Sequence, residues 1–223
     1  MFLKKNLFLI SLFSFFFIGC SFNIFNGYHK VEKRTVKENE VYSLFKKDTG
    51  TYFFQTSLQI LNNEISGIMV FKPSANNSCR VVFLNEIGIK YFDMDFFNIQ
   101  KNDSIDNFKI HYCMEALNRK PFINMLKNDI GLLLMNLNKN ERCIEFSQND
   151  FENKILKIKN KGEKNYYFYN VKTNRIKRIL QTSGILKKVN IDFYQNSDLF
   201  PDSIVISHFN IHFKMQLNTL SKN

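Results

Sequence analysis

The chain contains few residues that break helices and strands or that cross-link a fold. Its 223 residues include three prolines, eight glycines, four cysteines and no tryptophan. This composition excludes proline-rich or glycine-rich low-complexity linkers, and no internal repeat divides the chain. No two cysteines form a CxxC pair, and the motifs of a nucleophile elbow, a phosphate-binding loop and a dinucleotide-binding turn are absent. Because no catalytic motif is present, we expect a protein that is not an enzyme and that needs no cofactor.

Residues 1–20, MFLKKNLFLISLFSFFFIGC, are the most informative segment. Two lysines precede an apolar run from Leu7 to Ile18, which is the order of a secretory signal. The run is shorter than the roughly 20 apolar residues of a transmembrane helix. The ending FIGC resembles the lipobox of bacterial lipoproteins, in which the cysteine is lipidated and becomes the first mature residue. We therefore predict a signal peptide at 1–19 and lipidation at Cys20, with an ordinary signal and an incidental cysteine as the alternative.

The rest of the chain reads as a tether followed by one β-rich domain. Residues 20–47 have mixed charges and scattered apolar residues, which predicts a tether to a domain at 48–223. Apolar residues then alternate with polar ones in successive short runs, as in half-buried strands. A helical stripe at 121–137 interrupts them and begins with proline, which suits a first helical turn. The last run, 205–217, predicts one strand of about 43 Å. The predicted strands are 51–60, 64–72, 80–86, 89–97, 107–113, 143–146, 154–159, 166–172, 175–181, 186–194 and 205–217.

This order of elements behind a lipidated cysteine resembles the LolA/LolB-like lipoprotein carriers, and more specifically small envelope lipoproteins of Bacteroidetes-type bacteria. The local sequences GIMVFKP at 67–73 and CRVVFLNEIGIKYFDMDFF at 79–97 are similar to that group, as is the terminal segment 203–220. The resemblance implies a mainly β fold, an antiparallel incomplete (half-open) β-barrel with the inserted apolar helix as a lid. It also implies an outer-membrane location in the cell envelope and the binding of acyl chains of a lipid or a lipoprotein.

Apolar side chains on the predicted strand faces are candidates for lining a ligand cavity. Burial of an acyl chain is worth about 0.8 kcal/mol per methylene, so a modest cavity binds one without polar chemistry. The alternative for each residue is ordinary core packing, and the alternative function is a structural or interaction lipoprotein with a filled barrel. The predicted cavity residues are Phe54, Leu58, Phe92, Met94, Phe96, Phe209, Phe213 and Met215, and the predicted lid residues are Phe122, Met125, Leu126 and Leu133.

Positive charge is concentrated in one segment. Between Lys154 and Lys188, eleven basic residues accompany a single acid, Glu163, which gives a net charge of +10. An exported, lipid-tethered protein rarely meets nucleic acid, so we expect no nucleic-acid partner. Anionic lipid headgroups are the expected partner, at about 1 kcal/mol per basic residue near the surface; a solvated lysine-rich surface is the alternative. The residues predicted to face the membrane are Lys157, Lys159, Lys172, Arg175 and Arg178.

Two further patterns contain titratable groups. His208 and His212 lie about 13 Å apart on one predicted strand, too far to share an ion, so we predict no metal site. Asp93 and Asp95 lie about 7 Å apart on one side of a strand, a separation that also suits paired catalytic carboxylates. We favour an exposed polar face as the interpretation of this pair. The disulfide pairing stays open among Cys79, Cys113 and Cys143.

Overall fold

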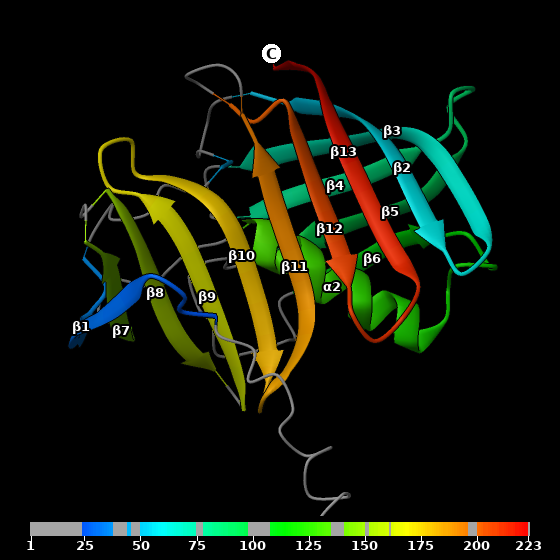
Figure 1. Ribbon diagram of the computed structural model, residues 1–223. Helices are drawn as coiled ribbons and strands as arrows, with labels where there is room; N and C mark the ends of the chain where they lie inside the picture. The colour runs from blue at the N-terminus through cyan, green and yellow to red at the C-terminus, as the bar shows by residue number, and fades with distance from the viewer. Residues whose placement is uncertain are drawn as a thin grey trace, which may run out of the picture.

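The computed structural model describes residues 24–37, 44–45, 50–74, 78–97, 108–134, 141–149, 152–160, 162–195 and 200–222. Within these residues, thirteen antiparallel strands form one sheet and one helix packs on it (Figure 1). The signal segment and Cys20 lie outside the described residues. The elements are β1 (Tyr28–Thr35), β2 (Tyr52–Ile60), β3 (Asn63–Ser74), β4 (Ser78–Leu84), β5 (Lys90–Phe96), β6 (Phe108–Cys113), α2 (Lys120–Leu134), β7 (Arg142–Gln148), β8 (Asn153–Asn160), β9 (Glu163–Asn170), β10 (Arg175–Ser183), β11 (Leu186–Tyr194), β12 (Ser203–His208) and β13 (Phe213–Lys222).

The strand order explains why α2 covers the sheet. The order is β1-β7-β8-β9-β10-β11-β12-β13-β2-β3-β4-β5-β6. The meander β2–β6 ends with β6 at one edge of the sheet. The meander β7–β13 begins with β7, which lies next to the other edge strand, β1, and it ends with β13, which pairs with β2. Because α2 connects β6 to β7, it has to cross one face of the sheet, and it lies behind the sheet in Figure 1. Among the described strands, β1 and β6 each have a partner on one side only, so the sheet is an incomplete barrel and the predicted fold class is confirmed.

Alternation along the strands directs apolar side chains toward α2. In β2, Tyr52, Phe54 and Leu58 are buried, whereas Gln55 and Gln59 are exposed. The buried residues of both meanders join one core cluster with apolar residues of the helix. These helical residues recur at intervals of three and four, which places them on one face of α2. They are Ile123, Leu126, Ile130 and Leu133.

A close approach of β3 and β4 requires glycine at position 67. A Cβ added to Gly67 would lie 1.9 Å from the carbonyl oxygen of Leu84. Such an overlap with backbone atoms cannot be relieved by a change of rotamer. A larger residue at this position would therefore force the two strands apart.

The C-terminal segment differs from its sequence prediction. Instead of one long strand at 205–217, the structure has the hairpin β12–β13 with its turn at 209–212, so the predicted 43 Å strand is wrong. The turn changes which positions point inward. Even-numbered Ile204 and Ile206 are buried in β12, whereas odd-numbered Phe213 is buried in β13.

The boundaries of the other elements lie closer to their predicted positions. The segment predicted as a tether, 20–47, contains β1, which pairs with β7 along its length. The helix begins one residue before its predicted start, and residues 135–140 lie outside the described part. β3 continues through Pro73, and the ends of the remaining strands differ from prediction by up to three residues. Within the described ranges, no helix has the length and apolarity needed to cross a bilayer.

Candidate functional site

The predicted cavity residues converge under α2. Phe54, Leu58, Phe92, Met94 and Met215 have no exposed surface, and Phe96 and Phe213 are nearly as buried. All seven belong to the core cluster that contains Leu126 and Leu133 of α2. In this structure they therefore pack against one another and against the helix, and their role in lining a ligand cavity stays a prediction.

Phe209 is the exception among the predicted cavity residues. It lies in the β12–β13 turn, and 52% of its surface is exposed. Its ring lies 4.8 Å from the ammonium of Lys187. The prediction that Phe209 lines the interior is wrong because the chain turns there instead of continuing as a strand.

The four predicted lid residues all lie on α2. Leu126 and Leu133 are fully buried in the core cluster. Phe122 and Met125 are partly buried and pack against the same cluster. They therefore lie at the margin of the interface between helix and sheet. Movement of α2 as a lid stays a prediction.

Polar side chains attach α2 to the sheet beside this apolar stripe. Nε2 of His208 in β12 lies 2.8 Å from Oδ2 of Asp129, and their side chains are 7% and 0% exposed. Burial raises the pKa of the Asp129 carboxyl, and the bond from His208 acts in the opposite direction. Asn128 and Gln181 of β10 exchange two amide hydrogen bonds of 3.1 and 3.2 Å. Sequence reasoning missed these contacts because His208 and Asp129 are 79 positions apart.

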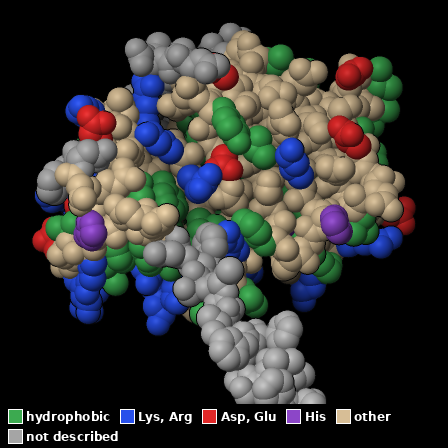
Figure 2. Space-filling view, in the orientation of Figure 1, with side chains coloured by type: hydrophobic (Ala, Val, Ile, Leu, Met, Phe, Trp, Pro, Cys, Tyr) green, Lys and Arg blue, Asp and Glu red, His purple; other side chains and the backbone are tan. Residues whose placement is uncertain are grey.

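A separate basic pocket lies over β1, β7, β8 and β9. Its volume is about 530 Å³. Six of its nine lining residues are lysine or arginine. Lys and Arg side chains project from the lower left of the molecule in Figure 2, the side on which these strands lie in Figure 1. The lining residues are Lys33, Arg34, Thr35, Arg142, Cys143, Ile144, Lys157, Lys159 and Lys164.

Strand pairing assembles this pocket from distant parts of the chain. Paired residues lie on the same face of a sheet, and so do residues two apart on one strand. Lys33 pairs with Ile144, which pairs with Lys157. Two positions along, Thr35 pairs with Arg142 and Lys159 pairs with Lys164. The two rows therefore share one face, on which Lys33, Arg142, Lys157, Lys159 and Lys164 come together.

Most cations of the basic pocket have no carboxylate partner among the described residues. Arg34 is paired with Glu145 through a 2.6 Å bond from Nε, but within the described part of the chain the other five basic residues form no ion pair. The ammonium of Lys157 lies 5.9 and 5.6 Å from the ring centroids of Phe25 and Tyr166. Burial lowers the pKa of Lys157, and repulsion from Lys164 and Lys30 lowers it further.

The residues predicted to face the membrane separate into two groups. Lys157 and Lys159 line the basic pocket. Lys172 pairs with Glu152 and Arg178 pairs with Asp192, and Arg175 lies on β10 outside the pocket lining. Sequence reasoning missed the four other pocket cations. Lys164 belongs to the basic segment, but Lys33, Arg34 and Arg142 carry no local signal that places them beside it.

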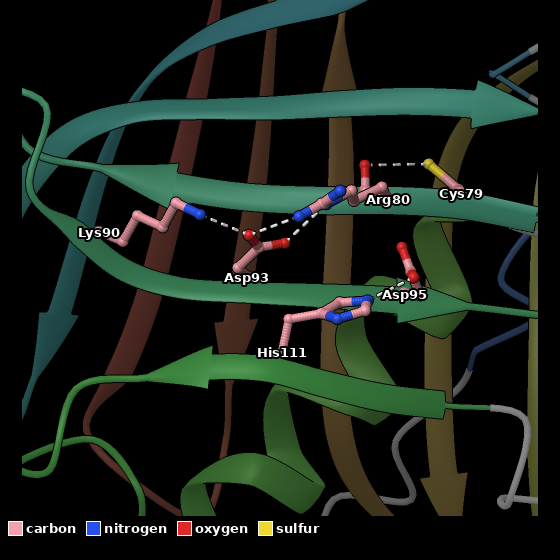
Figure 3. Close-up of polar contacts among 6 residues, drawn as sticks. All are labelled: Cys79, Arg80, Lys90, Asp93, Asp95 and His111. Atoms are coloured by element: carbon pink, nitrogen blue, oxygen red, sulfur yellow. Dashed lines mark hydrogen bonds and ion pairs between the residues drawn. The ribbon is translucent and has the colours of Figure 1, made fainter.

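Asp93 and Asp95 have separate partners (Figure 3). The Asp93 carboxylate accepts three 2.8 Å bonds, from Nε and Nη2 of Arg80 and from Nζ of Lys90. Its side chain is 1% exposed, so its interpretation as part of an exposed face is wrong. The two bonds from Arg80, together with the one from Lys90, lower the pKa of Asp93 to about 2 against the opposing effect of burial. Asp95 instead lies 2.5 Å from Nε2 of His111.

The cysteines and histidines supply no further site. Cys79, Cys113 and Cys143 form no disulfide with one another. Burial raises the pKa of the Cys79 thiol to about 12, which makes it a poor nucleophile. In the described residues, no group of three His, Cys, Asp or Glu side chains could hold a metal ion.

Comparison with known proteins gives matches among solved structures only. No family model and no curated protein matches the chain. A structure described as an outer membrane lipoprotein-sorting protein domain from Vibrio parahaemolyticus is similar at 9% identity and a TM-score of 0.44, over 78% of this chain and 84% of that one. A LolA superfamily protein from Nitrosomonas europaea is similar at 10% identity and 0.44, over 82% and 88%. A DUF1329 family protein from Desulfovibrio piger follows at 6% and 0.39, over 78% and 85%.

Proposed function

We propose that the protein is an envelope lipoprotein, anchored through Cys20, that binds acyl chains of a lipid or of another lipoprotein between α2 and the sheet. The observation that carries the proposal is the crossover helix itself, whose apolar stripe forms one wall of an apolar interior in a sheet with two unjoined edges. The similar Vibrio structure, described as a lipoprotein-sorting domain, is consistent with this role.

Binding requires α2 to move outward, because the interior is filled by its own side chains. The described polar bonds between α2 and the sheet join side chains, at His208–Asp129 and Asn128–Gln181, so the helix can separate without breaking a strand pair. An acyl chain would then replace helix contacts to residues such as Phe54 and Met94. Ten buried methylenes supply about 8 kcal/mol of gross transfer free energy. That amount is comparable with the roughly 4–15 kcal/mol cost of association, so α2 must be displaced at low cost.

A filled-barrel scaffold is the second candidate function. The complete burial of Phe54, Leu58, Phe92 and Met94 favours it, because a rigid core of this kind leaves no room for a ligand. In this alternative the protein acts through its surface within an envelope complex.

The absence of tryptophan allows a direct test of acyl-chain binding. In a Met125→Trp variant of the chain from residue 20 with Cys20→Ala, the single indole lies at the margin of the α2–sheet interface. We expect oleate to shift its fluorescence to shorter wavelength and to saturate, because the fatty acid changes the surroundings of α2. A Tyr194→Trp control on the exposed part of β11 should not respond. Equal responses, or none in either variant, would favour the scaffold.

A further inference from the structure

The basic pocket over β1, β7, β8 and β9 has no assigned role in the proposed acyl-chain site. We propose that it binds a phosphate-bearing group, as carried by a phospholipid headgroup or by a soluble phosphate compound. This site lies away from the α2-covered interior, and its occupation does not depend on any ligand under α2.

The arrangement of cations supports this proposal. Lys33, Arg142, Lys157, Lys159 and Lys164 lie on one face of four neighbouring strands, which are about 4.8 Å apart in any sheet. Like charges this close repel one another, and an anion bound between them would offset that repulsion. Burial lowers the pKa of Lys157, and the charges of Lys164 and Lys30 lower it further. Arginine and lysine are also the residues that proteins use to hold phosphate oxygens.

The single carboxylate of β7, that of Glu145, points away from the basic pocket. Glu145 occupies the position between Ile144 and Phe146 on β7, so its side chain lies on the opposite face of the sheet. There it is buried between Arg34 and Lys154, whose bonds outweigh burial and lower its pKa. Glu145 therefore neutralises Arg34 and Lys154 and leaves the other five cations of the basic pocket for an external anion.

The size and the surroundings of the pocket indicate a ligand larger than phosphate alone. Small-molecule pockets span about 300–1,000 Å³, and this one measures about 530 Å³. Lys157 lies between the pocket and a small apolar cluster that includes Phe146, Tyr166 and Phe25. A ligand with an anionic group and an adjoining apolar part would contact both.

Chain length brings a membrane surface near the pocket if Cys20 is lipidated as predicted. Ile24 packs against the same apolar cluster as Phe25. Ile24 lies four positions after Cys20, and four extended residues span at most about 14 Å. Lipid headgroups around the anchor would therefore lie within reach of the pocket cations.

The test measures binding to the full chain purified in a nonionic detergent. Isothermal titration with inorganic phosphate, glycerol 3-phosphate and dihexanoyl phosphatidic acid compares a free anion, a soluble ester and a short lipid. The variant Lys157→Gln with Lys159→Gln removes two pocket cations. The matched control, Lys172→Gln with Arg178→Gln, removes the same charge from residues that pair with Glu152 and Asp192. Circular dichroism checks the fold, and Arg142→Gln replaces the double variant should that fail to fold.

We expect the pocket variant to bind at least about tenfold more weakly, the effect of losing roughly 1.4 kcal/mol, with little change in the control. Tighter binding of dihexanoyl phosphatidic acid than of glycerol 3-phosphate would identify the ligand as a headgroup. Equal affinities would identify a soluble phosphate compound. The proposal is overturned if none of the three probes binds, or if the control loses as much affinity as the pocket variant, because the effect is then general surface charge.

Discussion

At the scale of single residues, the Asp93 carboxylate shows how a local pattern conceals its partners. The alternation of β5 places Asp93 opposite Phe92 and Met94, which predicts exposure to solvent. The side chains of Arg80 and Lys90 instead cover it and form three hydrogen bonds with it. No periodicity shows such coverage, since it depends on the pairing of β4 with β5.

The contribution of Asp93 to stability should depend on pH. Its pKa in the folded protein, about 2, lies below the ordinary value of 3.8. The stabilisation is therefore complete above about pH 4 and is lost as the pH falls toward 2. We expect Asp93→Asn to lower the free energy of unfolding by about 1–2 kcal/mol at pH 7, and by much less at pH 2.5. Urea unfolding at both pH values measures this, and an equal loss at both would contradict it.

At the scale of elements, the sequence predicts α2 well and the last hairpin poorly. Apolar residues recur at helical intervals through Leu126, Ile130 and Leu133, and the structure has the helix there. Polar and apolar residues alternate strictly from His208 to Leu217, through the turn, so alternation alone cannot show where the chain reverses. The burial of Ile206 in β12 and of Met215 in β13 marks the reversal, because the two strands pair at these residues.

The side-chain bonds of α2 give a prediction at this scale. Asp129→Ala removes the partner of the buried His208 and leaves that imidazole without its bond. Loss of a buried hydrogen-bond partner costs about 1–3 kcal/mol, which we expect in urea unfolding. Asp129→Asn keeps an oxygen at the same place and should recover much of the loss. Unfolding free energies equal to that of the wild type in both variants would show that the bond does not hold α2.

At the scale of the whole molecule, non-local pairing limits what the sequence can predict. The concentration of positive charge in 154–188 is visible in the chain, and Lys157 and Lys159 lie in the basic pocket. Lys33 and Arg142 join them only because β1 pairs with β7, more than a hundred positions away. The interior of the molecule depends on similar pairing, since β13 returns to β2 and closes the core beneath α2.

The central question for the whole molecule is whether the apolar interior takes up acyl chains. The side chains around Phe54 and Met215 fill it as it stands. If the protein is a carrier, α2 moves outward when a ligand binds; if it is a scaffold, α2 stays in place. The two functions therefore differ in whether the folded protein contains bound lipid.

The most direct test is native mass spectrometry of the chain from residue 20 with Cys20→Ala, expressed without its signal and purified without detergent. The carrier account predicts bound lipid that is lost on denaturation. A folded protein that carries no lipid, and that takes up none when incubated with fatty acid, would contradict it.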